Sequence, residues 1–552
     1  MSQPVTVTVS ADSAPVEGPL DGPAAEASGV MTHREVLEAM SGLLLAMFVA
    51  MLSSTVVSNA LPRIVESLHG SQTEYTWVVV ATLLTMTATT PIWGKLSDQF
   101  SKKALVQTAL VIYVIGSLVA GTAANMGILI GARAIQGLGV GGLTALVQVV
   151  IASMVTPRER GRYSGYIGAV FATATLSGPL IGGLIVDTPG LGWRWCFYVG
   201  IPVAVAAFVL LQKTLHLPVV RRPGKVSIDY LGATLLMGGV SILLIWVTLA
   251  GNQFGWTSTV SWALVVGGLA VIASAVYVEA RVAVDPIIPL RLFRDRTTAL
   301  ATGASLMVGV AMFGATVYLS QYFQIARGMS PTHAGLMTVF MVGGLVVSSL
   351  VTGRIITRTG RWKRYLVAGM VAVVVGVALL SQIDEVTPLW VLAVDMAVLG
   401  LGLGATMQNL VLSVQNNAAQ ADMGAASSLV AFFRSLGGSV GVAALGAVLA
   451  HQVSTQVTSG LTRMGLPTDT HQSHQIPDLS TLPESVRALF QQAFGDATGH
   501  LFLVALPFAV VALVCVVFIR EVPLRTTILR EDEVAPVAGA EEAEMVGSRA
   551  AR

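Results

Sequence analysis

The chain is a succession of apolar runs, each about as long as a bilayer is thick. A helix needs roughly 20 mostly apolar residues to cross the hydrocarbon core, and this sequence of 552 residues contains fourteen such runs. Charged residues make up 11% of it, whereas soluble domains carry about 25%. In lipid, backbone polar groups must be bonded internally, and apolar runs of this length satisfy that requirement as helices. The sequence predicts an all-α polytopic membrane protein with fourteen spans.

The order of the runs predicts two bundles of six helices with two extra helices between them. The segment 94–103, GKLSDQFSKK, is echoed by 353–364, GRIITRTGRWKR, about half a chain length later. Such internal similarity is expected of two parallel halves with a substrate site at their interface. We expect a disordered tail at 1–39, a first bundle at 40–216, an insert at 217–296, a second bundle at 297–522 that includes a partly helical extracytoplasmic loop at 451–497, and a disordered tail at 523–552.

Basic residues indicate the orientation of these spans. Lysine and arginine cluster at 102–103, 158–162, 221–225 and 361–364, in loops that fall on one side. Because such clusters stay cytoplasmic, we expect a multi-pass protein of the cell membrane with both termini inside. The net charge of +2 gives no reason to expect nucleic acid as a partner. The lipid bilayer is the expected surrounding, and we expect a monomer.

The spans hold many polar groups and few charges. The first span ends in MLSSTVVSNALP, residues 51–62, with five small polar residues and no acid. We interpret such groups as facing a substrate cavity, and the alternative is hydrogen bonding between helices. The cavity candidates are Ser53, Thr55, Asn59, Gln136, Gln321, Gln408, Asn409 and Arg434.

Asp395 is the acid that lies well inside a span. It is about seven residues into its run, roughly 10 Å from the nearer boundary, whereas Glu74, Asp187, Asp229 and Glu279 lie at span ends. A carboxyl at that depth suits proton exchange, and the alternative is a hydrated or structurally paired acid. Arg133, also inside a span, is costly there and indicates a polar cavity or a partner. Asp395 is therefore a candidate for proton coupling, and Arg133 is a second one only through its resemblance to the fourth-span arginine of the family named below.

The spans contain no nucleophile with a base and no cluster of metal ligands, so we expect neither an enzyme nor a cofactor or metal. His471 and His474 lie in the polar segment HQSH, where solvation is a better explanation than a metal.

Two motifs resemble those of the major facilitator superfamily. GKLSDQFSKK resembles its signature loop, with Gly94, Asp98, Lys102 and Lys103 matching and Ser101 replacing a glycine. The resemblance implies a loop that helps to lock the cytoplasmic gate. The span containing GAVFATATLSGPLIGG resembles the antiporter motif of the family's exporters, which is carried here by Gly168, Gly178, Pro179, Gly182 and Gly183. That motif implies export, although ordinary helix packing would use the same residues.

Further stretches resemble the fourteen-span drug:proton antiporters. They include WRWCFYVGIPVA at 193–204, with Gly200 in place of an asparagine, and the late spans at 400–417 and 424–446. That group commonly carries an aspartate in its first span, where this chain has Ser53. A serine hydroxyl does not ionise at physiological pH, so the family's carboxylate role does not transfer.

The resemblance implies proton-driven export of hydrophobic or amphipathic compounds, antibiotics included, by alternating access, with the proton gradient as energy source. Two alternatives remain. One is a narrow exporter of one natural product or lipid precursor, with altered or absent proton coupling. The other is a membrane signalling or interaction protein that kept the fold.

Overall fold

The computed structural model describes residues 33–70, 72–188, 190–215, 229–251, 253–283, 286–464 and 483–525. Within these ranges the chain is helical, and the one β feature is an isolated bridge between Ala250 and Phe254. Thirteen helical segments are long and apolar enough to cross a membrane. The long helix α6, Pro157–Asp187, adds a further element at the place of the fifth predicted span. The predicted all-α membrane fold is confirmed.

The helices of the first half follow the predicted order. They are α2 (His33–Ser67), α3 (Gln72–Gln99), α4 (Lys102–Gly121), α5 (Met126–Met154), α6 (Pro157–Asp187), α7 (Trp195–Tyr198) and α8 (Gly200–Thr214).

The insert and the second half follow in the same way. They contain α9 (Tyr230–Leu249), α10 (Thr259–Arg281), the short η1 (Leu290–Arg294), α11 (Arg296–Ile325), α12 (Pro331–Thr359), α13 (Lys363–Leu380), α14 (Leu389–Asn417), η2 (Gln420–Asp422), α15 (Met423–Arg463) and α16 (Glu484–Phe518).

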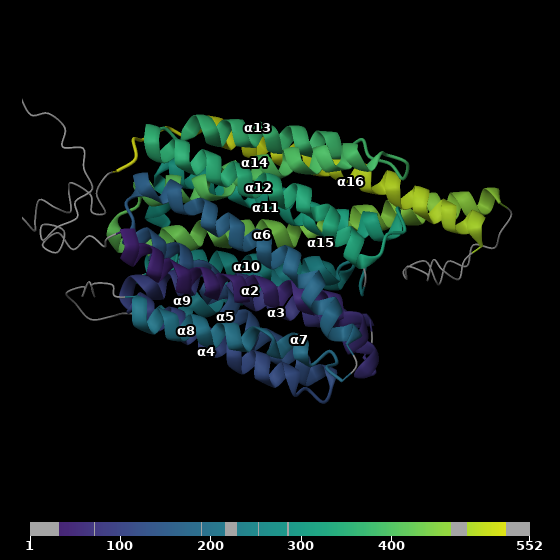
Figure 1. The fold of residues 1–552 in the computed structure, drawn as a ribbon, viewed down its shortest axis with the longest axis horizontal. Coiled ribbons are helices and arrows are strands. Elements are labelled where there is room, and N and C mark those ends of the chain that lie inside the picture. The colour runs from purple at the N-terminus through teal and green to yellow at the C-terminus, as the bar shows by residue number, and fades with distance from the viewer. Residues whose placement is uncertain are drawn as a thin grey trace, which may run out of the picture.

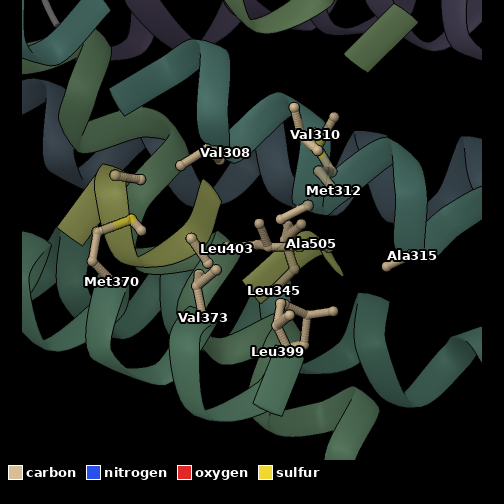
Figure 2. Packing of buried hydrophobic residues seen from close by; sticks show 14 of the residues in the cluster. Val308, Val310, Met312, Ala315, Leu345, Met370, Val373, Leu399, Leu403 and Ala505 are labelled. Atoms are coloured by element: carbon tan, nitrogen blue, oxygen red, sulfur yellow. The ribbon is translucent and has the colours of Figure 1, made fainter. Parts of the chain in front are cut away.

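The helices form two groups that lie side by side (Figure 1). Buried apolar residues between Val36 and Leu215 make two clusters within the first half, and those from Leu292 to Leu524 make one cluster in the second. Figure 2 shows part of the latter, to which Val308 of α11, Leu345 of α12 and Leu399 of α14 contribute. Each half therefore packs mainly around buried side chains that belong to that half.

The two halves contact one another chiefly where α3 packs on α15 and α6 packs on α12, with smaller contacts of α5 with α15 and of α6 with α14. The insert lies against the first of these pairs. Leu236 of α9, Ala275 of α10, Ala88 of α3 and Phe432 of α15 share one apolar cluster. The insert is therefore packed on both halves at once.

The sixth predicted span is one continuous segment, Trp195–Thr214. Helices α7 and α8 meet at Val199, which has helical dihedral angles. A backbone hydrogen bond is missing at this point because Pro202 has no N–H to donate to the carbonyl of Tyr198, four residues earlier.

The predicted extracytoplasmic loop 451–497 is largely helical in its described parts. Helix α15 continues to Arg463, and α16 begins at Glu484. With 41 and 35 residues, both exceed the roughly 20 that a bilayer requires. Their joined ends extend beyond the other helices, at the right of Figure 1. His471 and His474 lie outside the described residues.

Candidate functional site

At one end of the molecule, Asp98 joins the two halves. Its carboxylate accepts hydrogen bonds from the backbone N–H groups of Gly424, at 2.7 Å, and Ala425, at 3.0 Å. These groups open α15, whose own N-cap residue, Asp422, makes no side-chain cap. An anion at a helix N-terminus is stabilised by the unpaired N–H groups and the helix dipole. Asp98 therefore caps a helix of the other half.

Glycines allow this contact to form. A Cβ atom on Gly94 would lie 2.8 Å from the carbonyl oxygen of Gly424 and closer still to the side chain of Ser428. A Cβ atom on Gly424 would meet Gly94, Ser97 and Asp98. Helices α3 and α15 can approach this closely only because both positions lack a side chain.

The lysines of the predicted gating loop lie at the beginning of α4. Lys102 opens α4, and the Nζ atom of Lys103 donates to the carbonyl oxygen of Gln212 at 2.8 Å. Ser101, which replaces the family's glycine, is the N-cap residue of α4, and its hydroxyl accepts from the N–H of Ala104 at 3.5 Å.

A second polar network joins the halves at the same end. Nη1 of Arg160 donates to Oε1 of Gln415 at 2.9 Å, and Nε2 of Gln415 donates to the hydroxyl of Ser427 at 2.9 Å. Arg525 donates to the carbonyl oxygen of Gln415 at 2.8 Å. Further in, Gln148 contacts Gln408 across the interface at 3.4 Å. The halves are thus closed against each other at this end.

A cavity of about 1100 Å³ lies between α3, α9, α11, α15 and the beginning of α16. It is distant from the closed end, since Ser435 on its wall is eleven residues past Gly424, roughly 16 Å along α15. Among the described residues that line it there is no Asp, Glu, Lys or Arg. Its aromatic lining residues are Trp256, Phe313, Tyr318, Phe490 and Phe494, and its polar ones include Thr248, Gln321, Ser435, Ser439 and His451.

Arg133 lies in a buried polar cluster of the first half. Its Nη1 atom donates to Oε1 of Gln136 at 2.5 Å, and its Nε atom donates to the carbonyl oxygen of Val78 at 3.4 Å. Gln136 in turn donates to the hydroxyl of Ser117 at 2.8 Å. Arg133 is 3% exposed and forms no ion pair with any residue that the structure describes. The hydrogen bonds given above pair the Arg133 guanidinium with neutral oxygen atoms rather than with a carboxylate.

Ser53 lies at the far end of the same cluster. The hydroxyl of Tyr113 interacts with the hydroxyls of Ser53 and Ser117. A chain of uncharged polar groups therefore links the position of the family's missing acid to Arg133, through Tyr113, Ser117 and Gln136.

The predicted antiporter motif packs α6 against both halves. A Cβ atom on Gly178 would meet the side chain of Thr55, whose hydroxyl donates to the carbonyl oxygen of Ala174 at 3.3 Å. Gly168 lies beside Leu345 and Ser349 of α12, and Gly182 is buried. The side chains of Asn59 and Pro179 and the surroundings of Gly183 lie outside the described part.

Asp395 is buried in α14, with 4% exposed, and forms no ion pair among the described residues. Leu399 and Gly402, four and seven residues later, share its face of the helix. They pack against Gly376 and Val373 of α13. Asp395 is therefore turned toward α13, and it is not among the residues that line the cavity.

Of the predicted cavity residues, Gln321 lines the cavity described above. Asn409 donates to the carbonyl oxygen of Ala405 in its own helix at 2.6 Å. Arg434 is partly buried and directly precedes Ser435 of the cavity wall. Ser53, Thr55, Gln136 and Gln408 take part in the contacts between helices given above.

The sequence analysis missed residues that join the halves. Arg160 belongs to the basic cluster 158–162, which indicated orientation alone, and Gln415 lies in a stretch noted only for its resemblance. Nothing in the pattern of a single sequence distinguishes a loop arginine that crosses an interface from one that faces water. Tyr113 was also missed, because an aromatic residue in an apolar run gives no separate signal.

Two packed groups of helices, a polar closure at one end and an uncharged cavity farther along define a membrane transporter of the two-bundle type. The family model of the Major Facilitator Superfamily matches residues 43–442. The chain belongs to the major facilitator superfamily.

Named relatives agree with this assignment. An uncharacterized MFS-type transporter of Mycobacterium tuberculosis is 35% identical over 524 residues, which cover 95% of this chain and 74% of that protein. The efflux pump dotC of Dothistroma septosporum is 33% identical, with 93% and 87% covered. The multidrug transporter protein MdtP of Bacillus subtilis is 31% identical, with 85% and 82% covered.

A solved structure shows the same fold. The proton:xylose symporter XylE superposes with a TM-score of 0.58 at 13% identity, covering 91% of this chain and 99% of that one.

Proposed function

We propose that the chain is a secondary active exporter of hydrophobic or amphipathic organic molecules, driven by proton influx. The observation that carries this proposal is the cavity between the halves, whose described lining residues are apolar and aromatic, with a few polar groups and no Asp, Glu, Lys or Arg. Pockets of this kind suit bulky ligands with limited polarity. Relatives named efflux pump and multidrug transporter support export of more than one compound.

Alternating access supplies the mechanism. The halves are closed where Asp98 caps α15 and Arg160 contacts Gln415, so substrate in the cavity is separated from that end. In the orientation that the basic residues predict, this is the cytoplasmic end. Export then requires the Asp98 and Arg160 contacts to open while the opposite end closes over the empty cavity.

Protons provide the driving force in this proposal. One charge that moves down a potential of 100 mV releases about 2.3 kcal/mol, enough for a concentration ratio of roughly fifty. Asp395 is the proposed proton carrier of the second half, because it is a buried carboxyl deep in a span. Ser53 cannot act as a proton carrier, because a serine hydroxyl does not ionise at physiological pH.

The test is efflux of a panel of dyes and antibiotics, including ethidium, from energised cells. Wild type, Asp395→Asn and an empty vector are compared, with and without a protonophore. We expect the wild type to export panel members until the protonophore is added, and Asp395→Asn to lose that proton-dependent part. Glu159→Gln, an exposed acid of α6, serves as the matched control and keeps wild-type efflux.

Two results would contradict parts of the proposal. Full proton-dependent efflux by Asp395→Asn removes that residue as the carrier. A wild type that exports no member of the panel points to the narrow exporter, whose coupling would then be measured with its own substrate.

A further inference from the structure

Three ionisable side chains lie within electrostatic range of one another where the two-helix insert packs on the gate helix α3. Glu279 lies in the last turn of α10, Asp229 is the N-cap residue of α9, and Lys95 lies near the C-terminus of α3. The Glu279 carboxyl interacts electrostatically with both of the others. Glu279 is 8% exposed and Lys95 is 4% exposed. Ionisable groups are rarely buried to this extent without a function.

Each acid in this cluster uses one oxygen and leaves the other without a partner. Oε2 of Glu279 accepts from the N–H of Ile288 at 2.9 Å, and Oδ1 of Asp229 accepts from the N–H of Gly232 at 2.7 Å. Oε1 of Glu279 and Oδ2 of Asp229 are both buried, and neither has a hydrogen-bond partner among the described residues. Two neighbouring carboxyl groups thus each present a free acceptor.

As ionised carboxylates, Glu279 and Asp229 leave these two buried oxygens without a hydrogen-bond donor among the described residues. An ionised carboxylate only accepts, whereas a protonated carboxyl also donates one O–H. Buried polar groups are costly to leave unpaired, and two like charges that share a site disfavour double ionisation. A single proton relieves both problems, because it removes one charge and creates one donor.

We propose that Glu279 and Asp229 form a proton-binding site at the base of the insert, with Lys95 as the cation that faces it from α3. Binding adds one proton from water to a carboxylate oxygen, and release returns it to water, so no other bond changes. The cluster then alternates between a charge of −1, with two carboxylates and one ammonium, and neutrality.

The position of Lys95 connects this site to the gate. Lys95 directly follows Gly94 and precedes Asp98 by three residues, so it lies within the turn of α3 that contacts α15. The surrounding wall is apolar and includes Ala88 of α3, Ile287 and Phe432 of α15. A change of charge beside Lys95 therefore acts on the helix whose end closes the molecule. The insert contributes a titrating group to transport, in addition to its packing. This link to transport rests on the proposed proton-driven export, whereas proton binding itself does not.

Difference infrared spectroscopy of the purified full chain between two pH values tests the site directly, because it detects the C=O stretch of protonated carboxyl groups. The variants are Glu279→Gln, Asp229→Asn and the exposed control Glu159→Gln. Asp229→Asn retains the carbonyl oxygen that caps α9, so it preserves the fold at this point.

We expect Glu279→Gln to lose one titrating carboxyl band that the wild type and Glu159→Gln retain, and Asp229→Asn to shift the pH midpoint of that band. Size-exclusion profiles confirm that each variant is folded. Titrating bands that are the same in folded Glu279→Gln and in wild type overturn the proposal. If Glu279→Gln does not fold, an unchanged midpoint in Asp229→Asn overturns it.

Transport of ethidium into proteoliposomes under an imposed pH gradient separates this proposal from that of proton-driven export. If Glu279→Gln loses the titrating carboxyl band but wild-type transport does not depend on the pH gradient, the proton site is supported and proton-driven export is rejected. If Glu279→Gln keeps the band and wild-type transport is driven by the pH gradient, the proton site is rejected and the export proposal is supported.

Discussion

The contact made by Asp98 depends on charge and on two acceptor atoms. Each oxygen binds a different N–H of α15, from Gly424 and from Ala425. Caps of this kind contribute about 0.5–2 kcal/mol, and a negative charge adds to the effect through the helix dipole. A conformational equilibrium that transport must reverse is sensitive to a free energy of this size.

Replacement of Asp98 should weaken the closed end in steps. Asp98→Asn keeps one acceptor and loses the charge, whereas Asp98→Ala loses both acceptors. We expect the closed population at this end to fall in the order wild type, Asn, Ala, by roughly tenfold for Ala, as about 1.4 kcal/mol would give. Spin labels on the exposed residues Arg162 and Arg354 report the separation of α6 and α12. Equal distance distributions for all three proteins would contradict the capping role.

Ser53 offers a position at which an acid can be restored. Its hydroxyl contacts Tyr113, the first member of the neutral chain that reaches Arg133. Ser53→Asp places a carboxylate at that end, in the same buried cluster as the cation. We expect ethidium transport by this variant to gain a dependence on pH that Ser53→Ala lacks. An identical pH profile for wild type, Ser53→Asp and Ser53→Ala would show that this position is not coupled to transport.

Among the helices, the approach of α3 to α15 is set by the absence of side chains at Gly94 and Gly424. Alanine at Gly94 has to push the carbonyl of Gly424 and the side chain of Ser428 away. We expect Gly94→Ala to lower the transport rate severalfold and to shift the label distances toward the open state.

Gly343→Ala in α12 is the matched control, since a Cβ atom added at this position would meet no neighbouring atom within 4 Å. Replacing a helical glycine by alanine raises helix propensity by about 1 kcal/mol, so this variant should melt at the same or a higher temperature and transport normally. Similar losses in both variants would mean that the glycine itself, rather than the contact, matters.

The elements of the fold could be predicted in number and order, because a run of twenty apolar residues has few alternatives in a membrane. Their ends could not. The lengths of α15 and α16 depend on polar residues that continue a helix beyond the apolar run. Periodicity alone does not separate such an extension from a loop. The predicted domain boundaries and the proton-coupling residues remain predictions.

The site could be predicted only in part for a related reason. Glycines and Asp98 stand out because the motif fixes their spacing. The contact of Arg160 with Gln415 and the meeting of Glu279 with Asp229 join residues that are far apart in the chain, and one sequence carries no record of such pairs. Asp395 was found by depth, but depth does not say which neighbour it faces.

For the whole molecule, the cavity predicts which variants alter substrate size. Ser439 lines the cavity, whereas its neighbour Val440 is exposed on the outer face of α15, at 36%. Ser439→Phe fills part of the volume and should reduce export of bulky dyes more than that of small ones. Val440→Phe adds the same side chain on the outer face and should leave the order of substrates unchanged. Competition among dyes of graded size measures this order, and equal behaviour of the two variants would place the substrate elsewhere.

Helix α15 links places that are otherwise remote. It starts at the Asp98 cap, forms a wall of the cavity and continues without interruption to Arg463. Its 41 residues make a rod of about 60 Å, twice the thickness of the hydrocarbon core. A rod pivoted at one end magnifies rotation, so a tilt of about 5° at the cap displaces the far end by roughly 5 Å. Breaking two hydrogen bonds at one surface can therefore move a protruding structure beyond the other.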